Sequence, residues 1–469
     1  MIKRFIIFSV LGTALVSASP VSVGAQTGRP ASPVATLSYD EALAKLNASN
    51  ESLKAAAAEV MQRQQERAAV RSLYWPRIDL RAQATHLDDA IVIDLDPIRQ
   101  VINSLHRLPD SVLPPFESIA QKQNFWLSQV TATWPVYTGG KVQAANRAAA
   151  LQVEDASHRR TLTADMLATD LVRRYFALRL ALKARDVRSA VRDSLDRHVF
   201  EARRLEEEGF IARVERLHAE VAQARAVRDL KAAEQDVALA RTALASLLST
   251  PEQADPSDEL FLLTDIGPIE SYVATALLEH PGLKRLATQR GLTSEALRAE
   301  QGRWLPDVAV FGTRELHTDD LSLLSPKWAV GVAATFTVFD GFDRQHRIAA
   351  ARSQRARVDF LDARARRDVS TLVEQKYRTI TKAREQFISL DASVTLADEV
   401  VRVRSRAFDE GFGTSLEVVD AQLTLQAVKL QRLLAAYEFD VALAELLEAA
   451  GEPGRYSDLR RRADLFPER

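Results

Sequence analysis

The sequence predicts a mainly α-helical protein with four β-strands, built from two tandem repeats. Turn residues are sparse, since the 469 residues include only 17 glycines and 17 prolines. Two stretches, about 141–208 and 344–410, contain no proline and keep a helical pattern throughout. Segments of the first half also recur in the same order in the second half. So few turn residues favour long helices joined by few loops.

Residues 1–25 have the three parts of a secretory signal. Lys3 and Arg4 precede the apolar run FIIFSVLGTALVSA, and Val23-Gly24-Ala25 is a small-residue cleavage site. The run has 14 residues, which is short of the roughly 20 that cross a bilayer. Export is therefore favoured over a membrane anchor. We expect the mature chain to start near Gln26, with a linker over 26–36.

The repeat is read from two sets of landmarks. Leu53 and Pro76 recur 230 positions later as Leu283 and Pro306. Beyond them, WLSQVTATWPVYTGG recurs 202 positions later as WAVGVAATFTVFDGF, and EEEGFIARVERLHAEV recurs at the same offset as FDEGFGTSLEVVDAQL. The first repeat is thus 28 residues longer, all between Pro76 and position 126. We place the repeats at 37–250 and 267–450, with a linker at 251–266 and a tail at 451–469.

Each repeat predicts the same order of elements. A short helix and a medium helix lead into a strand, a loop and a second strand, and a very long helix, a glycine break and a return helix follow. The strands fall at about 77–86 and 126–136, then 307–315 and 328–338. The long helices, 141–208 and 344–410, are each on the order of 100 Å. The return helices, 212–249 and 414–449, carry apolar residues at intervals of three and four, which indicates coiled-coil packing.

The strands alternate between an apolar face and a polar face. In the first strand Ile78 and Leu80 alternate with Asp79 and Arg81. A run of about ten residues suits a tilted transmembrane strand better than a soluble sandwich strand, although a soluble sheet packed on helices is an equal alternative from this pattern alone. An open edge cannot lie in lipid, so a membrane-spanning sheet would require an oligomer. Aromatic residues at both ends of the apolar faces fit an interfacial girdle: Trp126, Trp134, Trp328 and Phe336.

Composition and motifs disfavour an enzyme. The chain has no cysteine, its net charge of -1 gives no footprint for nucleic acid, and its eight histidines form no metal-ligand pattern. No nucleotide loop or nucleophile elbow is present, so we expect no catalytic residue, metal or cofactor. Acids follow the glycine breaks at Glu215, Glu417 and Asp420. Their ordinary role would be a favourable interaction with the positive end of a helix.

The order of elements and the motifs TWPVYTGGK and GFGTSLEVVDAQLTLQAVKLQRLL resemble the TolC-type outer membrane efflux proteins. The resemblance implies a homotrimer in the outer membrane of a Gram-negative bacterium. Each protomer would give four strands to one 12-stranded transmembrane β-barrel in outer membrane lipid, and the helices would form a coiled-coil barrel across the periplasm. Pro76, Pro135 and Pro306 would mark the junction of barrel and helices, and the insertion, roughly 87–123, would be a loop outside the cell.

The same resemblance assigns the glycine breaks to periplasmic hairpin tips, where a closed aperture meets an adaptor. The tip and docking residues would be Gly209, Phe210, Gly411, Phe412 and Gly413. Rings of Glu417, Asp420 and Glu215 would line the aperture. Family members can hold the tip closed with hydrogen-bonded Tyr and Arg side chains, but Phe408 and Gly413 occupy those positions here. The lock must therefore differ or be weaker.

The resemblance implies a passive exit duct of a tripartite efflux or type I secretion system, which docks a periplasmic adaptor and an inner-membrane pump. The chain has no nucleotide site, so energy would come from a partner. A periplasmic coiled-coil adaptor or scaffold is the alternative from another class, because it would share export and long helices. An enzyme that acts on envelope polymers is third, and it would need a convergent polar site that the sequence does not offer.

Overall fold

The computed structural model describes residues 35–467 except 110, 115–116 and 319–325. The predicted signal peptide and most of the predicted linker at 26–36 lie outside the described residues. The first repeat contains β1 Ala35–Leu37, α1 Tyr39–Ser49, α2 Glu51–Arg71, η1 Ser72–Tyr74, β2 Arg77–His86, β3 Ile91–Asp94, α3 Asp96–His106, β4 Glu117–Gln121, β5 Asn124–Tyr137, α4 Lys141–Glu207 and α5 Arg213–Leu247. The remainder contains β6 Ala254–Pro256, α6 Ile269–Glu279, α7 Pro281–Gly302, β7 Asp307–Thr318, β8 Trp328–Thr335, α8 Asp343–Asp409, α9 Ser415–Ala450 and α10 Arg455–Arg461.

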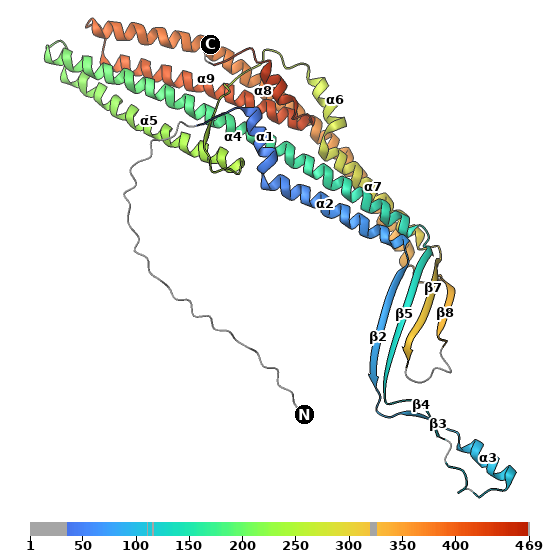
Figure 1. Cartoon of the computed structure of the whole chain (residues 1–469). Coiled ribbons are helices and arrows are strands. Elements are labelled where there is room, and N and C mark those ends of the chain that lie inside the picture. Colours follow the sequence, from blue (N-terminus) through green and yellow to red (C-terminus); the bar gives the residue numbers. More distant parts are fainter. Residues whose placement is uncertain (1–34, 110, 115–116, 319–325, 468–469) are drawn as a thin grey trace, which may run out of the picture.

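The molecule is elongated, with helical hairpins at one end and a sheet at the other (Figure 1). Helices α4 and α8 have 67 residues each, so each is on the order of 100 Å long. Helix α5 returns along α4 and α9 returns along α8. Toward the sheet, α2 and α7 take over as their neighbours. The fold is thus mainly α with one four-stranded sheet. None of the helices in the described part of the chain is both long enough and apolar enough to cross a membrane.

The sheet is antiparallel with the order β2-β5-β7-β8, so β2 and β8 are its edges. The register aligns Ile78 with Ala132 and Leu80 with Val130 on one face. Across the sheet, Val310 pairs with Val332. Leu80 and Val332 are each 68% exposed, so this apolar face lacks a covering layer within the described protomer.

The strand bounds differ from the predicted ones in three strands, of which β5 is longer by two residues at its start and one at its end. Strand β7 continues to Thr318, and β8 ends at Thr335 instead of 338. The ladder stops there because Thr335 pairs with Asp307, the first residue of β7. Phe336 therefore lies just past the strand. Pro135 lies inside β5, at an irregularity in the register with β7, as expected of a residue without a backbone N–H.

The insertion is more than the single loop that we predicted. Strands β3 and β4 pair as an antiparallel ladder, and α3 extends beyond them (Figure 1). Pro97 lies in the first turn of α3, where a missing N–H costs nothing. The apolar residues of α3 recur at helical spacing and Leu105 is 76% exposed. The sequence of α3 already has this helical spacing, so the prediction of a single loop was wrong for this segment.

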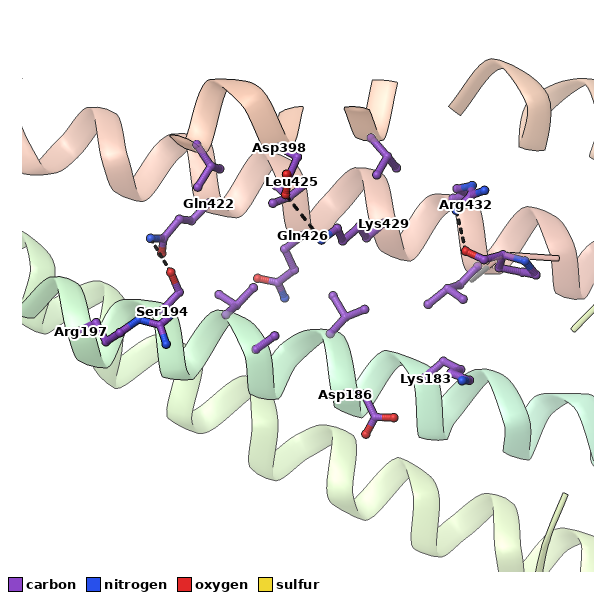
Figure 2. Close-up of a pocket in the computed structure, with 17 residues that line it drawn as sticks. Lys183, Asp186, Ser194, Arg197, Asp398, Gln422, Leu425, Gln426, Lys429 and Arg432 are labelled. Carbon is purple, nitrogen blue, oxygen red and sulfur yellow. Dashed lines mark hydrogen bonds and ion pairs between the residues drawn. The ribbon is translucent and has the colours of Figure 1, made fainter. Parts of the chain in front are cut away.

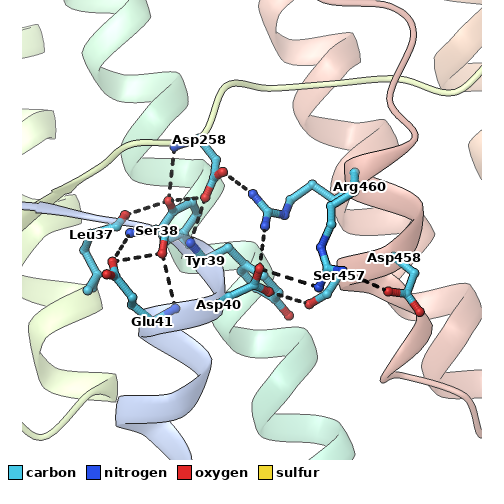
Figure 3. Close-up of polar contacts among 11 residues, drawn as sticks. Leu37, Ser38, Tyr39, Asp40, Glu41, Asp258, Ser457, Asp458 and Arg460 are labelled. Carbon is cyan, nitrogen blue, oxygen red and sulfur yellow. Dashed lines mark hydrogen bonds and ion pairs between the residues drawn. The ribbon is translucent and has the colours of Figure 1, made fainter.

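A polar network at mid-length joins three distant parts of the chain (Figure 3). The Asp258 carboxylate accepts hydrogen bonds from the Tyr39 backbone N–H and the Tyr175 hydroxyl, each at 2.7 Å. Arg460 pairs with Asp258 and, at 2.9 Å, with Asp40. The N-terminal segment, the inter-repeat linker and the C-terminal helix α10 therefore form one belt around α4. We predicted 251–266 only as a linker, but it contains β6, which pairs with β1. We predicted 451–469 only as a tail, but it contains helix α10.

Candidate functional site at the hairpin tips

Each hairpin turns at a left-handed glycine. Gly209 has φ of 78° and Gly411 has φ of 81°, a conformation that side chains with a Cβ rarely adopt. After α8, Phe412 N–H donates to Ala407 at 2.8 Å and Gly411 N–H donates to Phe408 at 2.9 Å. This paired pattern ends a helix by satisfying its last carbonyls. The α4 tip has the same arrangement, so the glycine breaks make the hairpin tips.

The phenylalanine that follows each glycine points outward. Phe210 is 72% exposed and Phe412 is 86% exposed. The two occupy equivalent positions of the repeats, at the end of the molecule farthest from the sheet (Figure 1). A large apolar side chain is therefore left in water at each of the two tips.

Glu417 is engaged within its own protomer. Its side chain accepts from the Thr414 N–H at 3.2 Å, and the Thr414 hydroxyl accepts from the Glu417 N–H at 3.3 Å. This reciprocal capping box fixes the start of α9. Arg404 of α8 also donates to Glu417 at 3.1 Å. Asp420 lies one turn further along α9, is exposed, and lines a groove of about 310 Å³ with Arg404 and Glu417.

Glu215 connects the two hairpins. Its carboxylate accepts a hydrogen bond of 2.8 Å from the backbone N–H of Ser415. Glu215 belongs to the first turn of α5 and Ser415 to the first turn of α9. The carboxylate therefore satisfies one of the free N–H groups at the start of a helix in the other repeat. The structure thus shows Glu215 as a bridge between hairpins.

Phe408 fills an apolar cluster between the hairpins, which we call the tip cluster. Its side chain is 1% exposed. The other members come from α4, α5 and α9: Val199, Ala202, Leu205, Ala219 and Val418. Gly413 lies close by, since a Cβ there would approach the Phe408 backbone nitrogen to 3.1 Å. The Phe408 side chain therefore packs between the two hairpins.

His198 adds a polar contact to the tip cluster. Its ring lies 4.6 Å from the Phe408 ring, and its Nε2 is 2.8 Å from the Ser415 hydroxyl oxygen. Burial lowers the pKa of the imidazole below its ordinary value, while the Ser415 hydrogen bond and the Glu215 carboxylate oppose that shift. His198 is therefore held neutral between the hairpins at neutral pH.

His198, Ser415 and Arg404 were not among the predicted site residues. The available signal was the position of His198 on the apolar stripe of its helix, between Leu195 and Ala202. Neither His198 nor Ser415 has a like residue in the other repeat, so the repeat comparison gave no help. Glu215, Glu417, Asp420, Phe408 and the tip glycines do come together at one end of the molecule, whereas the junction prolines and the predicted girdle lie at the other.

A cavity of about 500 Å³ separates α4 from the α8–α9 hairpin on the sheet side of the tip cluster (Figure 2). Gln422 donates to the Ser194 hydroxyl at 2.9 Å across its tip end. Its other end is closed by Arg432, which donates to the Pro467 carbonyl at 2.6 Å. The hairpins thus meet at the tip and at mid-length, with open space between these contacts. No cluster of three or more potential metal ligands occurs within residues 35–467 where the structure describes them.

Comparison with known proteins identifies the family. The family model described as "Outer membrane efflux protein" matches residues 42–250 and 273–452. Protein CyaE of Bordetella pertussis is 25% identical over 344 residues, which are 70% of this chain and 70% of that protein. The outer membrane protein VceC of Vibrio cholerae has a TM-score of 0.71 at 15% identity, covering 88% of this chain and 96% of VceC. The open state of the MtrE channel of Neisseria gonorrhoeae has a TM-score of 0.72 at 16% identity, covering 91% and 94%.

The chain therefore belongs to the outer membrane efflux protein family. It is a TolC-family outer membrane channel of the kind found in Gram-negative bacteria, and it is not an enzyme. Of the three function classes that the sequence left open, the family model selects the channel over the periplasmic adaptor and the enzyme. The resemblance seen in the sequence is confirmed.

Proposed function

We propose that three copies of this chain form one exit duct, with the sheet in the outer membrane and the hairpin tips in the periplasm. The observation that carries the proposal is the pair of sheet edges, β2 and β8, beside an uncovered apolar face. Backbone groups on such edges must be paired in lipid. Three protomers that join β2 of one to β8 of the next would close a 12-stranded barrel and satisfy every edge.

The predicted girdle supports this orientation. Trp126 and Trp328 lie toward the end of the sheet that is far from the helices, and Trp134 lies at the helical end, with Phe336 just beyond β8. Aromatic side chains at both limits of an apolar band favour the two membrane interfaces. Pro76 and Pro306 each precede a strand at the helical end, so the junction would lie at the periplasmic interface.

The tips would form the gate. In a trimer, Asp420 and Glu417 would each occur three times around one axis, and such rings favour cations over anions. The structure distinguishes the two acids, because Glu417 is neutralised in part by Arg404 at 3.1 Å while Asp420 is exposed. We expect Asp420 to determine most of the ion selectivity, and Glu417 to hold the helix start.

The test is ion selectivity in planar bilayers. Asp420→Asn should reduce cation preference, and Glu417→Gln should reduce it less, since glutamine keeps the capping box. Glu438→Gln is the matched control, because Glu438 is an exposed acid on the same helix, away from the tip. The proposed gate is refuted if the Asp420→Asn, Glu417→Gln double variant keeps the conductance and selectivity of the control.

The exposed tip phenylalanines would dock a periplasmic adaptor, which recruits an inner-membrane pump for efflux or type I secretion. Docking would then separate the tip helices. A photoreactive crosslinker at Phe210 or Phe412 should capture that adaptor in cells, and one at the exposed Phe360 should not. Capture of the same proteins from all three positions would contradict docking at the tips.

A further inference from the structure

A groove at the sheet end of the first repeat carries positive charge. It lies between the end of α2 and the start of α4, next to β5, and has a volume of about 710 Å³, within the usual range for small-molecule sites. We call it the junction groove. The arginine and aromatic residues that line it are Arg67, Arg71, Tyr74, Trp75, Trp134 and Arg147. No carboxylate lines it.

The arginines of the junction groove are poorly compensated. The side chains of Arg67 and Arg71 make no hydrogen bond or ion pair with another residue that the structure describes. The nearest carboxylate to Arg147 is that of Glu295, at 3.8 Å, and Arg298 already binds this carboxylate. Guanidinium groups that line one groove, with no carboxylate in its lining, favour a phosphate, which they bind through charge-assisted hydrogen bonds.

One aromatic residue of the groove, Trp134, lies on the apolar face of the sheet. Trp134 lies two residues from Ala132, the partner of Ile78 on that face. Its indole donates to the Tyr74 carbonyl at 2.9 Å, which holds it at the helical end of the strands. Trp75 is 72% exposed beside it. If the strands cross the outer membrane, as proposed above, the groove opens at the headgroups of the periplasmic leaflet.

The second repeat shows that the junction can be built without these charges. At the repeat offsets of 230 and 202 positions, Leu297, Gln301 and Ala349 replace the three arginines of the groove. The second junction has one buried arginine, Arg344, which pairs with Asp340 at 2.7 Å and stacks over Trp304 at 4.3 Å. That arginine is neutralised inside the fold. The second repeat therefore has no arginine at any of the three matching positions.

We propose that the junction groove binds the phosphate of a glycerophospholipid headgroup from the periplasmic leaflet, with Trp75 and Trp134 against the glycerol and upper acyl chains. The proposal rests on the proposed membrane orientation. Indole rings suit this interfacial level because they combine an apolar body with one N–H donor. One lipid would bind per protomer, so a trimer would carry three.

The test uses the full-length trimer in a neutral detergent with dioleoyl phosphatidylglycerol as the probe. Native mass spectrometry counts the lipids retained by the wild type and by the Arg67→Gln, Arg71→Gln, Arg147→Gln variant. Each arginine near an anionic headgroup contributes about fivefold to affinity, so the triple variant should bind about a hundredfold more weakly. Thermal unfolding and trimer mass check that the variant is folded.

The matched control removes three arginines from α8. Arg355, Arg357 and Arg367 are exposed and lie on the tip side of the junction, so their change to glutamine should leave lipid retention unchanged. Equal retention by both triple variants would overturn the proposal. So would displacement of the lipid by millimolar inorganic phosphate, or equal retention of an uncharged diacylglycerol, because these results would show a plain anion site or an apolar surface.

Conductance separates this proposal from the channel function. A wild-type trimer that conducts in bilayers but retains no phosphatidylglycerol would refute the lipid site and leave the channel intact. A chain that neither forms trimers nor conducts would refute the proposed duct itself. The arginine variant should conduct like the wild type, since Trp134 of the groove lies on the apolar face of the sheet, which would meet lipid in the proposed barrel and not the duct.

Discussion

Removing the Phe408 side chain should open the hairpin tips. Phe408 is 1% exposed and belongs to a cluster with residues of both hairpins. Truncating a buried phenylalanine to alanine costs about 3 to 5 kcal/mol. Since α8 reaches α4 and α5 at the tip through this side chain, we expect most of the loss to fall on the contact between hairpins. A loss of about 3 kcal/mol shifts a closed-to-open equilibrium by about a hundredfold.

The assay exploits the absence of cysteine from the chain. A single cysteine in place of Phe412 takes one spin label per protomer, so a trimer gives one set of equal distances across the aperture. Phe408→Ala should lengthen these distances and raise bilayer conductance. Phe360→Ala removes the same side chain from α8 at a position that is 76% exposed, and it should change neither.

The two variants would contradict this role of Phe408 if they gave the same spin-label distances and conductance while both remained trimeric. In that case, the tip cluster would not hold the hairpins together. Phe408→Leu offers a graded check, because leucine keeps part of the buried apolar volume. It should give an intermediate distance.

Three further predictions concern titration and the mid-length belt. We expect the neutral form of His198 to stabilise the closed tip. This contribution to stability is present above pH 6.5 and is lost as the pH falls below 6.5 toward the lowered pKa of His198. Conductance should therefore rise from pH 7 to pH 5, and His198→Gln should flatten that profile. Burial, with a smaller contribution from Glu448, raises the pKa of Asp165 to about 6, so the stability of the fold should fall as the pH rises from about 4 to 6. Asp165→Asn should raise the Tm at pH 7.5, because it removes up to about 3 kcal/mol of this cost, and it should change the Tm little at pH 4. Asp258→Ala leaves Arg460 without its closest partner and should cost about 3 kcal/mol, measured by thermal unfolding and by earlier proteolysis of α10.

The long helices, the four strands and the tips could be predicted because each has a local signal. Gly209 and Gly411 mark the turns through a backbone conformation that glycine favours, and the repeat doubles the evidence. The contacts of the tip had no such signal. His198 and Ser415 are 217 residues apart, and whether they meet depends on how α4 and α9 rotate about their axes. A shift of one residue along a helix rotates the direction of the side chain by about 100°. Composition and hydrophobic period therefore do not determine whether two such side chains meet.

The end of β8 and the belt were missed for a related reason. Because apolar and polar residues alternate as far as Val338, we predicted that β8 extends to that residue. A strand ends where its neighbour offers no more backbone partners, and the neighbouring strand β7 begins at Asp307. The short strands β1 and β6 are three residues each, too brief to show a period. Only their pairing across more than two hundred residues makes them strands.

The belt at mid-length provides a fixed point about which helix α4 can pivot. Tyr175 is bound there at Asp258 and Leu37, and α4 continues to Glu207 beyond it. The part of α4 from Tyr175 to Glu207 is about 50 Å long, so a tilt of about 5° at the belt would carry the tip by about 4 Å. The cavity on the tip side of the belt leaves space for such a tilt. In the proposed trimer, a small rotation of this kind would widen the aperture without breaking any hydrogen bond of the sheet.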